Sequence, residues 1–207
     1  MRLLAEGLSA RRGEDLIFND ISFSLAAGEA LVVTGPNGSG KSTLLRVLAG
    51  LLTAESGRLS IENGPSGFAH PHELSHYLGH RNAMKRELTV EENLSFWQRF
   101  LGDSPGGSGI DLSAAAEAVG LAGIAQLPFG YLSAGQQRRM AMAKLLVAYR
   151  PIWLLDEPTA ALDVSADRLF AGLVAAHLDH GGIVIAATHQ PLGIAQAKTL
   201  QMKGFTH

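Results

Sequence analysis

Short apolar runs rich in β-branched residues alternate along this chain with stretches of helical periodicity. The runs that read as buried strands lie at 30–34, 152–155 and 183–187. Apolar residues recur at helical spacing over 41–48, 133–148 and 163–178, and a capping box at Thr89 and Glu92 predicts another helix through about Phe100. Buried strands that alternate with helices predict an α/β fold around a mostly parallel sheet, with the mostly helical middle of the chain as an inserted subdomain.

Composition narrows the class of protein further. The 207 residues are 46% hydrophobic and 17% charged, with a formal net charge of -2 and no cysteine. This balance gives no electrostatic reason to expect a nucleic-acid partner, and the lack of cysteine excludes disulfides and thiolate metal sites. No apolar run approaches the length of a membrane span, and residues 1–14 contain no signal-peptide core. We therefore expect a cytosolic protein, or one attached to a membrane only through a partner.

A phosphate-binding loop follows the strand at 30–34. Its residues are Gly35, Pro36, Asn37, Gly38, Ser39, Gly40, Lys41 and Ser42. Glycines at these positions let backbone N–H groups turn toward phosphate oxygens, while Lys41 would reach the β- and γ-phosphates and the Ser42 hydroxyl would bind Mg²⁺. The pattern can arise by chance, but here it stands between a strand and a helix, as the mechanism requires.

Two carboxylates end the strand at 152–155. Asp156 could hold a water of a Mg²⁺ shell, and Glu157 could polarise an attacking water. A strand end capped by acidic residues is the simpler alternative, but the phosphate-binding loop in the same chain favours the functional interpretation.

A small-residue helix start precedes this strand, made of Leu132, Ser133, Ala134, Gly135 and Gln136. A hydroxyl, free backbone N–H groups and the positive end of a helix dipole suit an anion there. An ordinary helix cap would look the same in isolation, so the interpretation depends on the rest of the chain.

Together these motifs resemble those of the ATP-binding-cassette (ABC) ATPases over nearly the whole chain. Gly35–Thr43 resembles their Walker A motif, Leu132–Gln136 their signature, Ile152–Glu157 their Walker B motif, and Ala161-Leu162-Asp163 their D-loop. His189 resembles their switch histidine.

The resemblance implies a P-loop NTPase cassette that uses ATP and Mg²⁺. It implies a RecA-like core and an antiparallel β subdomain over about 1–80 and 150–207, and a helical subdomain over about 81–150, in one domain of 207 residues. Lys41, Glu157 and His189 would be catalytic, and Ser42 and Asp156 would hold the metal. Two copies of the chain would sandwich ATP, with Ser133 and Gly135 of one copy facing the Walker A motif of the other.

Three positions depart from the family pattern. His80 stands where the family usually has glutamine, and is a weak candidate for the metal site. Arg12 stands where an aromatic side chain usually stacks on adenine; arginine can stack there too, although a solvent-facing Arg11-Arg12 pair is the alternative. Ala134 replaces the more common glycine of the signature.

Four segments point to a subfamily. They are Tyr77–His80, Leu132–Arg139, Trp153–Pro158 and Ala187–Leu192, and they are similar to ATP-binding subunits of haem exporters in cytochrome c biogenesis. Membership would imply integral membrane permease subunits of a cytochrome c maturation complex as partners, and a place on the cytoplasmic side of the cell inner membrane. The alternative is another small exporter or a lipoprotein-release complex.

Two other classes of protein fit the sequence less well. A clamp acting on DNA or ribosomes usually carries two cassettes or a long coiled coil, and a P-loop kinase would not need Leu132–Gln136.

Three further groups have simpler interpretations. The histidines at 70, 72, 76 and 80 are expected in loops and strands and not in a metal centre. Phe96, Trp97 and Phe100 are expected to pack in the core of the helical part, with a groove for a membrane partner as the alternative. Arg138 and Arg139 are expected on a solvated helix face.

Overall fold

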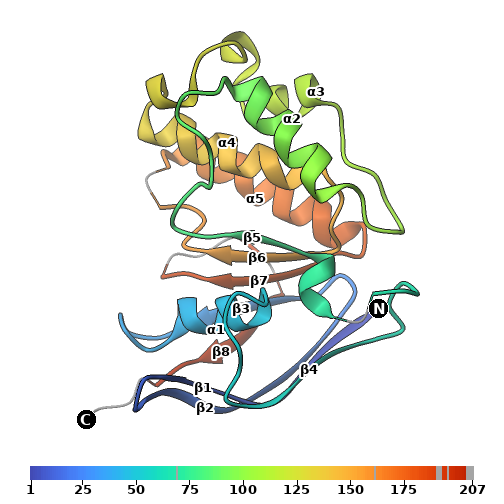
Figure 1. Cartoon of the computed structure of the whole chain (residues 1–207), viewed down its shortest axis with the longest axis vertical. Helices are drawn as coiled ribbons and strands as arrows, with labels where there is room; N and C mark the ends of the chain where they lie inside the picture. The colour runs from blue at the N-terminus through green and yellow to red at the C-terminus, as the bar shows by residue number, and fades with distance from the viewer. Residues whose placement is uncertain (69, 161, 190–192, 195, 204–207) are drawn as a thin grey trace. The chain divides into compact units, whose positions relative to one another are not determined.

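The computed structural model describes residues 1–207 except 69, 161, 190–192, 195 and 204–207 (Figure 1). The chain divides into two compact units, one of Met1–Gly79, Pro151–Pro158 and Val174–His207 and one of His80–Arg150 and Thr159–Leu173. The second unit thus includes residues 159–173, which the sequence placed with the core. The assignment of 1–207 as a single ATP-binding domain stays a prediction.

A five-stranded parallel sheet forms the centre of the first unit. In spatial order its strands are β5 (Ser75–Leu78), β6 (Ile152–Asp156), β7 (Ile183–Ala187), β3 (Ala30–Thr34) and β8 (Lys198–Gln201). Every residue of β6 and β7 is buried, which explains why both read as continuous apolar runs and show no alternation. The predicted parallel core is confirmed.

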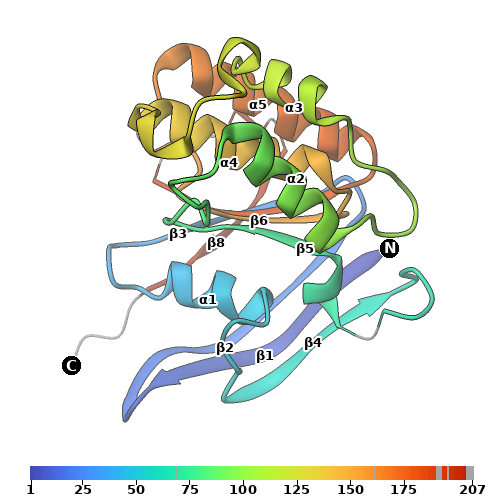
Figure 2. The same ribbon diagram turned by 45° about the horizontal axis from the view of Figure 1, so that its top comes forward.

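A second, antiparallel sheet belongs to the same unit. Its strands β1 (Arg2–Arg12), β2 (Asp15–Ala26) and β4 (Ser56–Glu62) lie in the order β2-β1-β4. Helix α1 (Lys41–Leu48) lies between the two sheets, where Leu44, Leu45 and Leu48 are fully buried (Figure 2). A short 3₁₀ helix, Pro71–Leu74, precedes β5. The expected antiparallel β part is confirmed.

The second unit is helical. It contains α2 (Val90–Leu101), α3 (Leu112–Ala118), α4 (Ala134–Val147) and two 3₁₀ turns, Ala122–Ile124 and Phe129–Tyr131. Helix α5 (Val164–Asp179) begins in this unit, and its last turns belong to the first. No helix in the described part of the chain is long and apolar enough to cross a membrane.

Local capping sets where these helices begin. Thr89 Oγ1 accepts a hydrogen bond from Glu92 N, and the Glu92 carboxylate accepts one from Thr89 N, so the predicted capping box is confirmed. Asp111 caps α3 by accepting from Ser113 N at 2.9 Å. At the other end of α2, the Arg150 guanidinium donates to the carbonyls of Leu101 and Gly102, which satisfies acceptors that the helix leaves open.

One histidine in the first unit is held neutral by its surroundings. The His177 ring stacks on the Trp153 ring of β6, with centroids 4.0 Å apart and planes 11° apart. The backbone of Gly182 lies against the same ring, and His177 Nε2 is buried with no hydrogen-bond partner among the described residues. Burial lowers the pKa of His177 to about 4, from an ordinary value of 6.5.

We expect acid to destabilise the first unit through His177. Between pH 6.5 and about 4 the unfolded chain binds a proton that the folded chain does not, so the free energy of unfolding falls as the pH falls through this window. The loss should be about 1 kcal/mol per pH unit, since one pKa unit corresponds to roughly 1.4 kcal/mol and the ring is not fully enclosed. Urea unfolding of the wild type and of His177→Phe across this window measures it. The variant should show a flatter pH dependence, and the exposed His180→Gln should keep the wild-type slope; equal slopes in all three proteins would contradict the assignment.

Candidate nucleotide site

The loop between β3 and α1 has a backbone that only glycine fits. Gly35 has φ 143°, and a Cβ there would lie 2.3 Å from the Met202 carbonyl oxygen and 2.8 Å from Ser39 Oγ. Gly40 has φ 94°, and a Cβ there would lie 2.7 Å from Ile17 Cγ2. The loop therefore presses against β2 and the end of β8, and the glycines permit this approach.

Lys41 is directed back over this loop. Its ammonium donates to the carbonyls of Gly35 at 2.7 Å and Pro36 at 3.1 Å, and it lies 3.1 Å from His189 Nε2. The side chain is 8% exposed, so its charge acts within a partly desolvated pocket. It also stands at the start of α1, where backbone N–H groups lack partners within the helix. The positive charge and the free N–H groups suit a phosphate group.

The carboxylate of Asp156 faces the same loop. Ser42 Oγ donates to Asp156 Oδ1 at 2.9 Å, and Asp156 is 2% exposed. A hydroxyl and a carboxylate oxygen side by side are hard donors of the kind that Mg²⁺ prefers, and Mg²⁺ at nucleotide sites takes its other ligands from water and phosphate. The two residues therefore fit the metal that the sequence predicts.

Glu157 is turned away from its neighbour. Its φ is 44°, an unusual value for a residue with a side chain, and its N–H donates to the Ala187 carbonyl at 2.8 Å. Glu157 Oε1 lies 3.7 Å from His189 Nε2. The strained backbone thus sends the two adjacent carboxylates to different partners, Ser42 and His189.

His189 joins the loop to the end of β7. Besides Lys41 and Glu157, its Nε2 contacts Asn37 Oδ1 at 3.0 Å. The imidazole is half exposed, at 49% of its side-chain surface, so it can reach a ligand held by the loop. The structure thus brings Asn37, Lys41, Glu157 and His189 together in one unit.

Sequence reasoning missed Tyr77, which lies on β5 beside the Asp156 strand. Its hydroxyl donates to Asp156 Oδ2 at 3.4 Å. Burial raises the pKa of the Tyr77 hydroxyl, and the negative charge of Asp156 adds to this rise. The segment Tyr77–His80 indicated only a subfamily, and nothing in it points to Asp156, because this contact depends on the parallel pairing of two strands far apart in sequence.

Two weaker candidates remain predictions. Arg12 ends β1 at an exposed hairpin turn, opposite Asp15, and its side chain makes no hydrogen bond or ion pair within the described part of the chain. A cavity of about 280 Å³ lies between β2, the loop and the end of β8, and is lined by Ile17, Ser39 and Met202 among others. His80 is exposed and is the first residue of the second unit.

Within the described residues, no cluster of three or more His, Cys, Asp or Glu side chains could hold a metal ion by itself.

The segment Leu132–Gln136 starts α4 in the second unit. Ser133 Oγ accepts from Gln136 N at 3.3 Å, and Gln136 Oε1 accepts from Ser133 N at 2.8 Å. The same unit holds Asp163, whose Oδ1 accepts from Ala166 N at 2.8 Å and caps α5. Ala161 lies outside the described residues. The roles expected for these residues opposite a second copy stay predictions.

Of the two arginines after this helix start, Arg138 is buried and Arg139 is partly exposed, so the expectation of a solvated pair was wrong for Arg138. Arg138 is 5% exposed and lies 3.4 Å from Asn82 Oδ1, and Arg139 donates to the Val119 and Gly120 carbonyls at 3.1 and 3.3 Å. Further along α4 the ammonium of Lys144 lies 4.6 Å from the centre of the Trp97 ring. Burial lowers the pKa of Lys144 to about 8, with a smaller contribution from the charge of Arg138.

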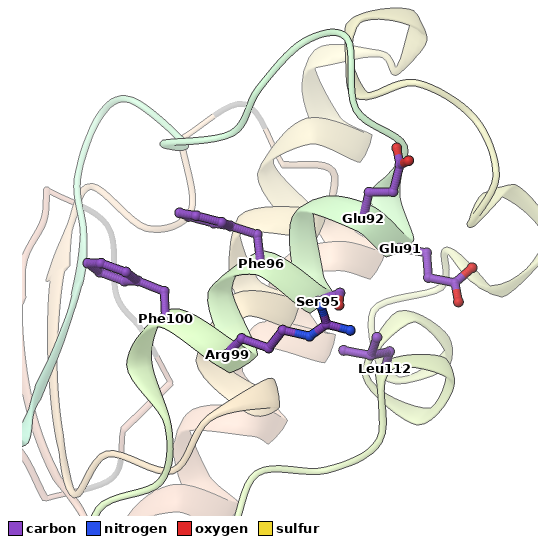
Figure 3. A pocket seen from close by; sticks show the side chains of 7 residues that line it. All are labelled: Glu91, Glu92, Ser95, Phe96, Arg99, Phe100 and Leu112. Atoms are coloured by element: carbon purple, nitrogen blue, oxygen red, sulfur yellow. The ribbon is translucent and has the colours of Figure 1, made fainter.

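Two of the three α2 aromatics are exposed, so the expectation of core packing was wrong for them. Phe96 and Phe100 are 47% and 68% exposed, and Figure 3 shows both rings projecting from the same side of the helix. Trp97 differs, since its Nε1 donates to the Ala83 carbonyl at 3.1 Å. An open groove of about 780 Å³ runs along α2 and is lined by Glu91, Glu92, Ser95, Phe96, Arg99, Phe100 and Leu112.

Comparison with known proteins identifies the family. Residues 18–160 match the family model described as ABC transporter. The chain belongs to this family. It is 86% identical over 207 residues to the cytochrome c biogenesis ATP-binding export protein CcmA of Rhizobium meliloti (strain 1021), covering 100% of both chains. It is 67% identical to the protein of that name from Rhizobium etli (strain ATCC 51251), covering 99% of this chain and 96% of the relative.

A solved structure supports the fold. A putative ABC transporter ATP-binding protein from Pyrococcus furiosus superposes with a TM-score of 0.81 at 22% identity, and the match covers 98% of each chain. The predicted P-loop NTPase fold and the predicted family are therefore confirmed, and the family implies ATP binding.

We expect Gly35→Ala to impair nucleotide binding more than it impairs folding. The added methyl group would meet the Met202 carbonyl and Ser39 Oγ, so the loop must shift away from phosphate-binding geometry. ATP affinity, measured by calorimetric titration, should fall at least about tenfold, which corresponds to roughly 1.4 kcal/mol. Gly13→Ala is the matched control, because Gly13 also has a positive φ, 63°, but a Cβ there meets no atom within 4 Å. Equal affinities in the two variants would contradict this account of the loop.

Proposed function

We propose that this chain is the Mg²⁺-dependent ATPase subunit of a membrane ABC complex that exports or hands over haem in cytochrome c biogenesis. Family membership supports ATP binding, and the names of the relatives at 86% and 67% identity, both cytochrome c biogenesis ATP-binding export proteins, support cytochrome c biogenesis. The observation that carries the hydrolytic part is the contact network of Lys41, Ser42, Asp156, Glu157 and His189.

In this proposal the loop and the strand ends divide the work on ATP. Backbone N–H groups of Gly35–Thr43 hold the phosphates, and Lys41 neutralises charge on the β- and γ-phosphates. Ser42 and Asp156 would hold Mg²⁺, which supplies further neutralisation of phosphate charge when bound. Glu157 orients and polarises the attacking water, and His189, already within 3.1 Å of Lys41 Nζ, contacts the γ-phosphate.

A second copy of the chain would complete the site. In the proposal ATP lies between the Walker A loop of one copy and Ser133 and Gly135 of the other, where the start of α4 offers a positive helix end. Asp163 would lie at the same contact. Binding of ATP then closes the dimer and hydrolysis reopens it. In the proposal it is dimer closure that drives the conformational change in the membrane complex.

The membrane subunits would meet the α2 face. Phe96 and Phe100 stack on each other with centroids 5.6 Å apart, and Figure 3 shows Glu91 and Arg99 on the other side of α2. The same groove is lined by both groups and by Glu92. An exposed apolar pair next to a charged helix face fits a short amphipathic helix of a permease. Such contacts would hold the chain on the cytoplasmic side of the inner membrane. The alternative is another small exporter or a lipoprotein-release complex. It would hydrolyse ATP in the same way and would differ only in the membrane subunit that the chain binds.

Glu157→Gln should separate binding from hydrolysis. The amide keeps the size of the side chain but cannot polarise water as a carboxylate does, so ATPase turnover should fall by about 10²-fold or more. ATP binding should persist, and gel filtration with ATP should show a dimer. Wild-type turnover in this variant would refute the role of Glu157, and phosphate transfer only in the presence of a small-molecule acceptor would favour a kinase.

Replacing Phe96 and Phe100 together by serine should release the chain from its membrane partner. Both rings are exposed, so the fold should tolerate the change, whereas the apolar pair is lost. The chain is purified in mild detergent from the native host, and the membrane protein that it retains is identified. Loss of that protein in the double variant tests the Phe96–Phe100 surface, and the identity of the protein tests the proposed transport substrate. A retained subunit of cytochrome c maturation supports the haem proposal, and a lipoprotein-release permease refutes it. The exposed Leu127→Ser, on the same unit, is the control.

A further inference from the structure

We infer that Tyr77 is a positioning residue for the Asp156 carboxylate and thereby sets how strongly the metal contributes to nucleotide binding. The inference rests on the proposed function, because it concerns the same metal site. It is carried by two hydrogen bonds that meet at Asp156, one from Ser42 of α1 and one from Tyr77 of β5.

The two oxygens of Asp156 are held from different elements. Oδ1 accepts from the Ser42 hydroxyl at 2.9 Å, and Oδ2 accepts from the Tyr77 hydroxyl at 3.4 Å. A carboxylate otherwise turns easily about its last bond, since that torsion has broad minima. Bonds to both oxygens restrict this rotation in a residue that is only 2% exposed.

The direction of the Tyr77 bond follows from the chemistry of its partner. A carboxylate has no hydrogen to donate, so the Tyr77 hydroxyl donates its single hydrogen to Asp156 Oδ2. The tyrosine thus orients the carboxylate without placing a formal charge next to it.

Gly79 leaves room for the Tyr77 ring. A Cβ on Gly79 would lie 2.8 Å from Tyr77 Cε1 and 3.1 Å from its hydroxyl oxygen. Gly79 itself has no positive φ, so a methyl group there displaces the ring without straining the backbone. The pairing of Tyr77 with Leu154 on β6 fixes the position of the ring along the sheet.

The test compares nucleotide affinity with and without the metal. Binding of the non-hydrolysable analogue AMP-PNP is titrated in Mg²⁺ and in EDTA, and the ratio of the two dissociation constants gives the contribution of the metal. In Tyr77→Phe the ratio of the dissociation constant in EDTA to that in Mg²⁺ should fall about fivefold, while affinity in EDTA stays at the wild-type value. This is less than the loss of a full hydrogen bond to a charged group, because the bond is 3.4 Å long and acts on the metal only through Asp156. Binding of Mn²⁺ to the AMP-PNP complex, followed by electron paramagnetic resonance, should weaken to the same extent.

Two further variants separate positioning from stability. Gly79→Ala keeps the hydroxyl but displaces it, so it should reduce the ratio as well, and adding it to Tyr77→Phe should cause no further loss. Tyr149→Phe removes a tyrosine hydroxyl from the second unit and should match the wild type. If Tyr77→Phe keeps the wild-type ratio of dissociation constants, the inference about Tyr77 is overturned and the proposed metal site is unaffected. A wild-type protein whose affinity is the same in Mg²⁺ and EDTA overturns the proposed metal site itself.

Discussion

The register of three parallel strands is the constraint on which the rest of the site depends. Val33 of β3 and Asp156 of β6 both pair with Ala187 of β7, so the three strands end at the same level. The ladder continues one step further, because Glu157 N donates to the Ala187 carbonyl and Thr188 N to the Val33 carbonyl. Whatever follows each strand must therefore lie at one edge of the sheet. A slip of one strand by a single residue would reverse the faces of its side chains and separate the loop from its carboxylates.

The positive charge of Lys41 and the negative charges of Asp156 and Glu157 lie at the same edge of the sheet. They can bind phosphate and metal only if they do not pair with each other. If Lys41 paired directly with Asp156 or Glu157, the loop would lose its positive charge for phosphate. The described contacts avoid this, because Lys41 is held by carbonyl oxygens of its own loop and Asp156 by neutral hydroxyls. The positive φ of Glu157 serves the same separation. Such backbone strain costs about 1–2 kcal/mol and persists only where neighbouring contacts hold it, here the bond to Ala187.

The sequence predicted what is decided locally and missed what depends on distant partners. The glycine-rich loop and the capping box at Thr89 involve residues close in the chain, so their residue types alone indicated the structure. The bonds of Arg139 were not predicted because its partner carbonyls at 119 and 120 are about twenty positions away and come from the end of another helix. Tyr77 was missed for the same reason, since the strand beside it follows more than seventy residues later. The exposure of Phe96 could not be read from periodicity, which shows that a face is apolar but not whether anything covers it.

The helix cap at Ser133 shows how a structural role and a binding role can share one hydroxyl. As a cap, Ser133 Oγ accepts from Gln136 N, which uses a lone pair and leaves the hydroxyl hydrogen to donate elsewhere. Gln136 closes the reciprocal bond with Ser133 N, so both side chains are oriented before any ligand arrives. Gly135 places no side chain on the first turn, so the neighbouring N–H groups stay accessible. In the proposed dimer a phosphate of the opposite copy would therefore meet a donor that costs little to orient. The capping interpretation and the signature interpretation are thus compatible, because they use different parts of the same hydroxyl group.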